Sequence, residues 1–221
     1  MSDGASRGFF IVLEGIDGSG KTTQCRLLAE WLRGQGVPLV ATAEPGGTPL
    51  GQRVRSLLLD GSDAISRLAE LFLFQASRAQ LLEQLIRPAL AAGQVVLCDR
   101  YTLSTIAYQG YAGGLPLDVV RQSCTLATDG LEPDLIVLLD LPVADSLPRR
   151  KAPDRVESRG AEYHQHVRDG FLSEVQLLAR TNPLRVQIVD ARPDPASVQA
   201  QLRRAILNHP DWPFPHVQTD D

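Results

Sequence analysis

A glycine-rich segment near the N-terminus restricts the possible folds of this chain more than any other feature. Residues 15–22 read Gly-Ile-Asp-Gly-Ser-Gly-Lys-Thr and match the pattern GxxxxGK[ST]. The segment follows the apolar run FFIVL at residues 9–13, and a helical pattern begins at Lys21. Glycines let consecutive backbone N–H groups point into one concave turn, and the positive end of the following helix adds to the attraction for anions. This context predicts a phosphate-binding loop made of Gly15, Ile16, Asp17, Gly18, Ser19, Gly20, Lys21, Thr22 and Thr23.

A loop of this type indicates a nucleoside triphosphate, ATP or GTP, and a Mg²⁺ ion. Lys21 would place its charge at the terminal phosphates, and the Thr22 hydroxyl would ligate the metal. The only asparagines, Asn182 and Asn208, precede Pro and His, so the NKxD element with which signalling GTPases read guanine is missing. Motor and AAA⁺ ATPases usually need more than 221 residues. A small phosphotransferase that uses ATP remains.

Apolar runs alternate with segments of helical period along the chain. Runs rich in Val, Ile and Leu occur at residues 9–13, 38–42, 95–98, 135–139 and 186–189. Continuous apolarity is typical of strands that are covered on both faces. The repeated order of strand and helix therefore predicts an α/β fold: a five-stranded parallel sheet with helices on both faces. We expect one domain over residues 1–221, with its core at about 9–207.

Composition argues against several classes of protein. Lys and Arg total 22 against 26 Asp and Glu, a net charge of −4, which provides no general attraction to nucleic acid or to a membrane surface. No apolar run approaches the ~20 residues of a membrane-spanning helix, and the N-terminus lacks the apolar core of a signal peptide. The cysteines are odd in number and form no CxxC pair: Cys25, Cys98 and Cys124. We expect them to be reduced core residues of a cytoplasmic protein.

Two segments depart from the alternation of strand and helix. Residues 148–155 read PRRKAPDR and carry four positive charges within an acidic chain. Residues 209–221 contain three prolines and three aspartates and show no helical period. We expect residues 208–221 to form a surface arm, loosely ordered.

Three further motifs resemble those of one enzyme family. Glu44-Pro45-Gly46-Gly47-Thr48 is followed by LFQASR at 73–78 and by DRYTLSTIAYQG at 99–110. In order and spacing these motifs resemble the bacterial thymidylate kinases, from about Phe9 to Leu207. The resemblance implies an enzyme that uses Mg-ATP to convert dTMP to dTDP, in the supply of dTTP for DNA. It also implies a homodimer.

The resemblance gives the acceptor nucleotide a set of binding residues. Phe74 and Arg78 are four residues apart and share a helix face, so that a ring can stack on the base while a guanidinium donates to thymine O4. Thr105 and Gln109 would bond the thymine ring, Tyr108 would crowd out a ribose 2′-OH, and Asp17 would reach the 3′-OH. Arg100 suits bidentate contact with the acceptor phosphate. The expected dTMP site comprises Asp17, Glu44, Arg55, Phe74, Arg78, Arg100, Ser104, Thr105, Tyr108 and Gln109.

Positive charge should carry most of the catalysis, because phosphoryl transfer asks for positioning and charge compensation. The resemblance places Asp99 near Mg²⁺, with Thr22 as the second metal ligand. Some thymidylate kinases carry a basic residue at the position of Gly18, and this chain resembles the other type, whose catalytic arginine comes from a short mobile lid, here at about 148–157. We expect Arg150 or Arg155 to reach the γ-phosphate and Arg149 to lie nearer the adenine. The expected catalytic residues are Lys21, Asp99, Arg100, Arg150 and Arg155.

Ala43 departs from the family pattern, which commonly has an arginine before EPGGT. Two other readings also stay open. The chain could be a different small-molecule kinase, acting on another nucleotide or on a deoxynucleoside, although a nucleoside would need a base for its 5′-OH and would not explain Arg100. It could also be a regulatory module that binds nucleotides without turnover. Lys21, Thr22, Asp99 and the basic segment argue against that reading, because a pure binder does not need charge at the γ-phosphate.

Overall fold

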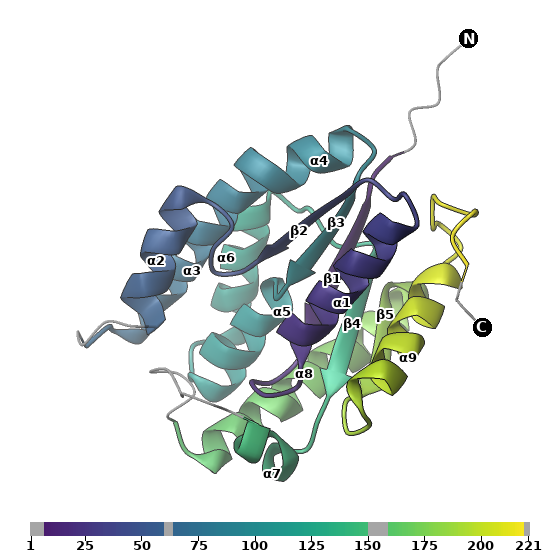
Figure 1. Cartoon of the computed structure of the whole chain (residues 1–221). Helices are drawn as coiled ribbons and strands as arrows, with labels where there is room; N and C mark the ends of the chain where they lie inside the picture. The colour runs from purple at the N-terminus through teal and green to yellow at the C-terminus, as the bar shows by residue number, and fades with distance from the viewer. Residues whose placement is uncertain (1–6, 60–63, 150–158, 219–221) are drawn as a thin grey trace.

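The computed structural model describes residues 7–59, 64–149 and 159–218. Its centre is a five-stranded sheet of β1 (Phe9–Glu14), β2 (Leu39–Ala43), β3 (Val95–Asp99), β4 (Leu135–Asp140) and β5 (Val186–Asp190). All the pairings are parallel, and the strand order is β2-β3-β1-β4-β5 (Figure 1). The predicted α/β fold with a five-stranded parallel sheet is confirmed, and each strand lies within one residue of its predicted position.

Burial differs between the central and the edge strands. β1 and β3 are buried throughout, and β4 is buried except at Asp140. The expectation of burial on both faces is wrong for the edge strands, since β2 is only partly covered and Gln187 and Ile188 on β5 are exposed. Each edge strand has a neighbour on one side only, and the flanking helices leave its outer residues uncovered (Figure 1).

Helices cover both faces of the sheet. In Figure 1, α1 and α9 lie in front of the sheet and α8 lies behind it, while α2, α3 and α6 form a group beyond β2. Two segments have π-helical hydrogen bonding, namely η1 (Leu82–Ile86) and η2 (Ile106–Ala112), and two others are short 3₁₀ turns, η3 (Leu147–Arg149) and η4 (Pro183–Arg185). The α-helices are α1 (Lys21–Gly34), α2 (Pro49–Leu59), α3 (Arg67–Leu81), α4 (Arg87–Ala91), α5 (Thr102–Thr105), α6 (Leu117–Thr128), α7 (Val143–Ser146), α8 (Ala161–Thr181) and α9 (Pro195–Leu207).

The strand register brings the sequence motifs together. Leu13 and Ala43 both pair with Asp99, so β1, β2 and β3 end at the same level of the sheet. The glycine-rich loop follows β1, Glu44 follows β2, and Arg100 follows β3. Ligands of parallel sheets bind at the carboxyl ends of the strands, and three predicted motifs meet there.

The C-terminal segment packs against the body of the protein. Trp212 and Val217 are buried. The Trp212 ring meets Phe9 edge to face at a centroid distance of 5.3 Å, and its indole N–H donates to the Phe214 carbonyl at 3.0 Å. The expectation of a loosely ordered arm is therefore wrong for residues 209–218. Trp212 and Phe214 are large apolar side chains, and burying them offsets the cost of ordering the segment.

The predicted lid falls mostly outside the described residues. Arg150 and Arg155 belong to the part of the chain that the structure does not describe, whereas Arg149 is described. Across the described residues, none of the helices is both long and apolar enough to cross a membrane.

Candidate active site

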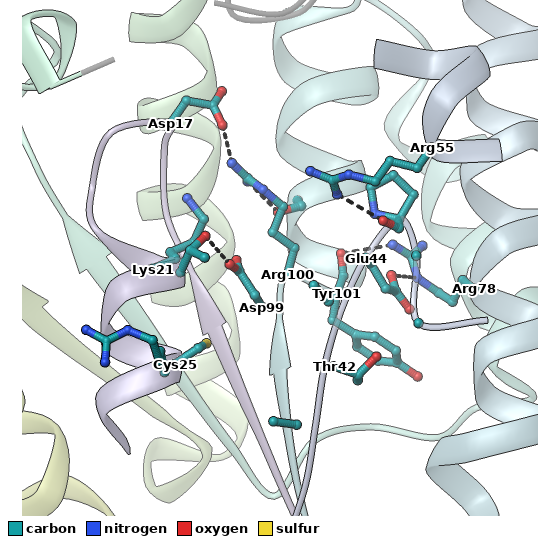
Figure 2. A pocket seen from close by; sticks show the side chains of 18 of the residues that line it. Asp17, Lys21, Cys25, Thr42, Glu44, Arg55, Arg78, Asp99, Arg100 and Tyr101 are labelled. Carbon is teal, nitrogen blue, oxygen red and sulfur yellow. Dashed lines mark hydrogen bonds and ion pairs between the residues drawn. The ribbon is translucent and has the colours of Figure 1, made fainter. Parts of the chain in front are cut away.

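A cavity of about 1130 Å³ opens at the carboxyl ends of β1, β2 and β3. Figure 2 shows side chains from the glycine-rich loop, from the ends of β2 and β3, and from the helices beyond β2 pointing into it. Gly15, Ile16 and Ser19 are not among its lining residues. The predicted residues that line the cavity are Asp17, Gly18, Gly20, Lys21, Thr22, Thr23, Glu44, Arg55, Phe74, Arg78, Asp99, Arg100, Ser104, Thr105, Tyr108, Gln109 and Arg149.

Lys21 lies folded into the glycine-rich loop. Its ammonium donates to the Ile16 carbonyl at 2.8 Å and to Ser19 Oγ at 3.4 Å. Gly20, just before α1, has a left-handed backbone with φ 91°, a conformation that costs glycine little. Burial and the nearby Arg100 charge lower the pKa of Lys21 to about 8. The loop thus holds a cation in a desolvated position, which an anion would stabilise.

Thr22 and Asp99 form the pair that was predicted to hold a metal. The Thr22 hydroxyl donates to Asp99 Oδ2 at 2.7 Å. The other carboxylate oxygen, Asp99 Oδ1, is buried and has no hydrogen-bond partner among the residues that the structure describes. A buried oxygen of this kind calls for a cation or a water molecule. Among the described residues no three His, Cys, Asp or Glu side chains gather as a metal site. This suits Mg²⁺, which takes one or two protein ligands and completes its shell with phosphate oxygens and water.

Arg100 lies at the centre of a polar cluster between the loop and η2. Its guanidinium donates to the Gly15 carbonyl at 3.1 Å and to Ser104 Oγ at 3.0 Å, and it forms an ion pair with Asp17. The Tyr108 hydroxyl donates to the second Asp17 oxygen at 2.6 Å. Burial alone would raise the pKa of Asp17, but the charges of Arg100 and Lys21 outweigh burial and lower it. Asp17 is therefore a carboxylate, held in place by two of the predicted acceptor residues.

Glu14 supports this cluster and was missed by the sequence analysis. Glu14 Oε1 accepts the backbone N–H groups of Tyr101 and Ser104, and Oε2 accepts the Ser104 hydroxyl at 2.5 Å. Arg100, the residue before Tyr101, adopts a left-handed backbone with φ 74°, which is uncommon for a residue with a side chain. Burial raises the pKa of Glu14. A charged residue at the end of the wholly apolar run FFIVL was the signal that could have identified it.

Arg78 is more deeply buried than its predicted role in base contact suggests. It is 1% exposed, and Nε forms an ion pair with Glu44 Oε2 at 2.7 Å. Nη1 donates to Gln75 and contacts Cys124 Sγ, and Nη2 donates to the Tyr101 carbonyl and to Thr105 Oγ1. Every N–H group of Arg78 thus has a protein acceptor. Its contact with a base carbonyl stays a prediction, and it would require one of these bonds to be exchanged.

Three further residues of the predicted acceptor site are Glu44, Arg55 and Ser104. Burial raises the pKa of Glu44 to about 7, because the ion pair with Arg78 offsets only part of the desolvation. Arg55 Nη1 donates to the Pro45 carbonyl at 3.0 Å, with the side chain directed across the cavity mouth (Figure 2). Ser104 Oγ donates to Glu14 and accepts from Arg100, so its proton is already used within the protein.

Two features bear on the donor side of the cavity. Gly18 has φ 81°, and a Cβ there would lie 2.6 Å from the Ser146 carbonyl oxygen, so a basic side chain at this position would require α7 to move. Arg149 donates to the carbonyls of Ala191 and Arg192 in the loop after β5, at 2.9 and 3.2 Å. It lines the cavity, and its predicted place near adenine remains a prediction.

The fold and the site together define a P-loop phosphotransferase: a parallel sheet, an anion-binding loop with its lysine, and an arginine–carboxylate cluster beside that loop. Comparison with known proteins narrows this class. The family model described as Thymidylate kinase matches residues 13–202. The chain belongs to the thymidylate kinase family.

Individual relatives agree with the family model. The thymidylate kinase of Synechococcus sp. (strain JA-2-3B'a(2-13)) is 52% identical over 193 residues, covering 87% of this chain and 91% of that protein. The thymidylate kinase of Deinococcus radiodurans is 46% identical over 204 residues, covering 91% and 97%. The crystal structure of thymidylate kinase from Ehrlichia chaffeensis superposes with a TM-score of 0.73 at 34% identity, covering 89% of this chain and 97% of that one.

Proposed function

We propose that this protein transfers the γ-phosphoryl group of Mg-ATP to dTMP, giving ADP and dTDP. The observation that carries the proposal is one continuous cavity with two anion-binding arrangements. Lys21 lies within the glycine-rich loop, and Arg100, whose guanidinium pairs with Asp17 of the same loop, lies beside it toward η2. Such a cavity suits two phosphorylated substrates that meet end to end.

The reaction needs little proton chemistry from the protein. A phosphate oxygen of dTMP, already ionised, forms a bond to the γ-phosphorus, and the bond from that phosphorus to the β,γ-bridging oxygen breaks. ADP leaves with the electron pair. Lys21 would bind the phosphates of ATP, and Arg100 would bind the phosphate of dTMP and reduce the repulsion between the two anions.

Mg²⁺ would be held by Thr22 and Asp99 together with phosphate oxygens. The unpartnered Asp99 Oδ1 supports this assignment. When bound, the ion supplies charge neutralisation at the β- and γ-phosphates. The Thr22–Asp99 hydrogen bond would orient both ligands toward it.

The catalytic arginine is assigned to Arg150 or Arg155, in the predicted lid. Gly18 supports this assignment, because the Ser146 carbonyl leaves no space for a basic side chain within the loop.

We further propose a cytoplasmic homodimer. Apolar side chains are exposed along the group of helices beyond β2: Leu50 and Leu57 on α2, Leu68 and Phe72 on α3, and Val119 and Leu126 on α6. Six exposed apolar side chains on neighbouring helices favour burial against another protein surface, and a second copy of this chain would provide that surface. The three cysteines are buried and free, which suits a reducing compartment.

The proposed reaction is tested by measuring ADP formation with Mg-ATP and either dTMP or thymidine. We expect turnover with dTMP and none with thymidine, because only dTMP carries the phosphate that Arg100 would bind. We also expect Arg100→Ala to lower kcat/KM for dTMP by at least about 100-fold. Turnover with thymidine, unharmed in Arg100→Ala, would overturn the proposal in favour of a nucleoside kinase. No ADP with either acceptor would indicate a module that only binds nucleotides.

A further inference from the structure

Gln109, a predicted contact of the acceptor base, is hydrogen-bonded to a residue that the sequence analysis left unassigned. Gln109 Nε2 donates to Glu70 Oε1 at 3.0 Å. Gln109 comes from η2 and lines the cavity, while Glu70 comes from the first turn of α3, one and two turns before Phe74 and Arg78. Both side chains are buried. The contact therefore joins the two elements between which a base would lie.

Glu70 fixes which end of the Gln109 amide faces the cavity. The Glu70 carboxylate also forms an ion pair, between Oε2 and Arg159 Nη2, at 3.3 Å. A carboxylate can only accept hydrogen bonds, so the end of the amide that faces it must be the NH₂ group. No described residue donates to Gln109 Oε1. Gln109 thus offers its carbonyl oxygen, an acceptor, to a ligand in the cavity.

Thr105 complements Gln109 one helical turn earlier. Thr105 Oγ1 accepts a hydrogen bond from Arg78 Nη2 at 3.0 Å. Because Arg78 can only donate, the hydroxyl proton of Thr105 must point elsewhere and is available to a ligand. The two cavity residues therefore offer one donor and one acceptor, and each polarity is set by a buried charged residue behind it.

From this arrangement we infer that Glu70 is a positioning residue that selects the base of the acceptor nucleotide. It holds Gln109 so that the site accepts a pyrimidine imide, in which a ring N–H lies beside a carbonyl oxygen. A cytosine-type base presents the reverse pattern, a ring nitrogen acceptor beside an amino donor, and would leave Gln109 Oε1 facing a lone pair. The inference rests on the proposed function, because it assumes that the acceptor base lies against Gln109.

The test compares dTMP with 5-methyl-dCMP, which differ only in this donor and acceptor pattern. In Glu70→Gln, the oxygen of the new side-chain amide should accept from Arg159, so that its NH₂ group faces Gln109. The Gln109 amide should then turn over, with its oxygen toward residue 70 and its NH₂ group toward the cavity. We expect kcat/KM for 5-methyl-dCMP to rise about tenfold or more and kcat/KM for dTMP to fall. General damage to the site would lower both values, so the rise is the decisive readout. Glu70→Ala, which frees the amide to turn, should show a smaller rise.

Arg159→Gln is the matched control, because it removes the same ion pair but keeps the carboxylate behind Gln109. We expect it to retain the wild-type ratio of kcat/KM for the two nucleotides. The inference is wrong if neither Glu70 variant raises 5-methyl-dCMP turnover, or if Arg159→Gln raises it equally. If the wild-type protein fails to prefer dTMP over 5-methyl-dCMP, the proposed base site is itself wrong, and the inference fails with it.

Discussion

At the scale of single residues, the binding of phosphate depends on the protonation of Lys21. Burial lowers the pKa of Lys21 to about 8 in the protein without nucleotide. Above that pH most of the Lys21 amine is neutral, so the binding of an anion requires the uptake of one proton from solvent. We therefore expect the Kd for ADP to be flat near pH 7 and to rise toward about tenfold per pH unit above pH 8.

Calorimetric titration with ADP over this range measures the effect. Lys21→Arg is the control, since a guanidinium stays charged at these pH values and its Kd should not vary with pH, whatever its absolute value. A wild-type Kd that is constant up to about pH 9.5 would contradict the account.

Glu14 provides a second test at this scale, through the backbone that it supports. Glu14→Ala removes the acceptor of two buried N–H groups, and we expect it to lower the free energy of unfolding by about 3 kcal/mol. Glu14→Gln keeps the Oε1 acceptor and loses only the bond from the Ser104 hydroxyl, so it should cost less, about 1.5 kcal/mol. Urea unfolding measures both. Equal losses in the two variants would show that the role of Glu14 is not hydrogen bonding to the turn at Arg100.

At the scale of elements, the sequence predicted strands better than it predicted helix geometry or the C-terminal segment. Near-continuous apolar runs locate buried strands, because the pattern depends on local residues alone. The π-helical geometry of η2, which carries Tyr108 and Gln109, has no comparable signature. The close packing of Tyr111 on Gly170 of α8, a residue about 60 positions away, belongs to the fold and cannot be read from the local pattern.

The C-terminal segment is the clearest case, and it leads to a prediction about stability. Residues 209–218 lack any period, yet Trp212 is buried against Phe9 at the start of β1. We expect Trp212→Ala to lower the free energy of unfolding by about 3 kcal/mol in urea denaturation, because the substitution removes buried apolar surface and leaves a cavity against Phe9. A loss below about 0.5 kcal/mol, the usual range for a surface substitution, would show that the segment contributes nothing to the fold.

At the scale of the whole molecule, the motifs predicted which residues gather at the cavity, and the partners of each residue were beyond prediction. Arg78 illustrates the difference. Its spacing from Phe74 placed it on the cavity side of α3. Its ion pair with Glu44 and its bond to Thr105 join three elements, however, and only the folded chain brings these together. Sequence motifs thus locate a site, while the polarity of its groups follows from tertiary contacts.

The proposed dimer is also a property of the whole molecule. Phe72 is 58% exposed on α3, near the middle of the proposed interface. A charge there would have to be buried without a partner, so we expect Phe72→Glu to convert the dimer to a monomer in light scattering coupled to gel filtration. Ile188→Glu is the control, because Ile188 is 51% exposed on β5, the edge strand at the opposite end of the sheet from β2. A wild-type monomer, or a dimer unaffected by Phe72→Glu, would contradict the proposed interface.

The measurement that tests the account most directly is kcat/KM with Mg-ATP across acceptors that each change one feature of dTMP: dUMP, ribo-TMP and 5-methyl-dCMP. The account predicts the highest value for dTMP and a lower one for dUMP. It predicts little turnover of ribo-TMP, because Tyr108, which donates to Asp17 at 2.6 Å, is proposed to crowd out a 2′-OH. It also predicts little turnover of 5-methyl-dCMP. Equal turnover of dTMP and ribo-TMP, or of dTMP and 5-methyl-dCMP, would contradict the assignment of this cavity to dTMP.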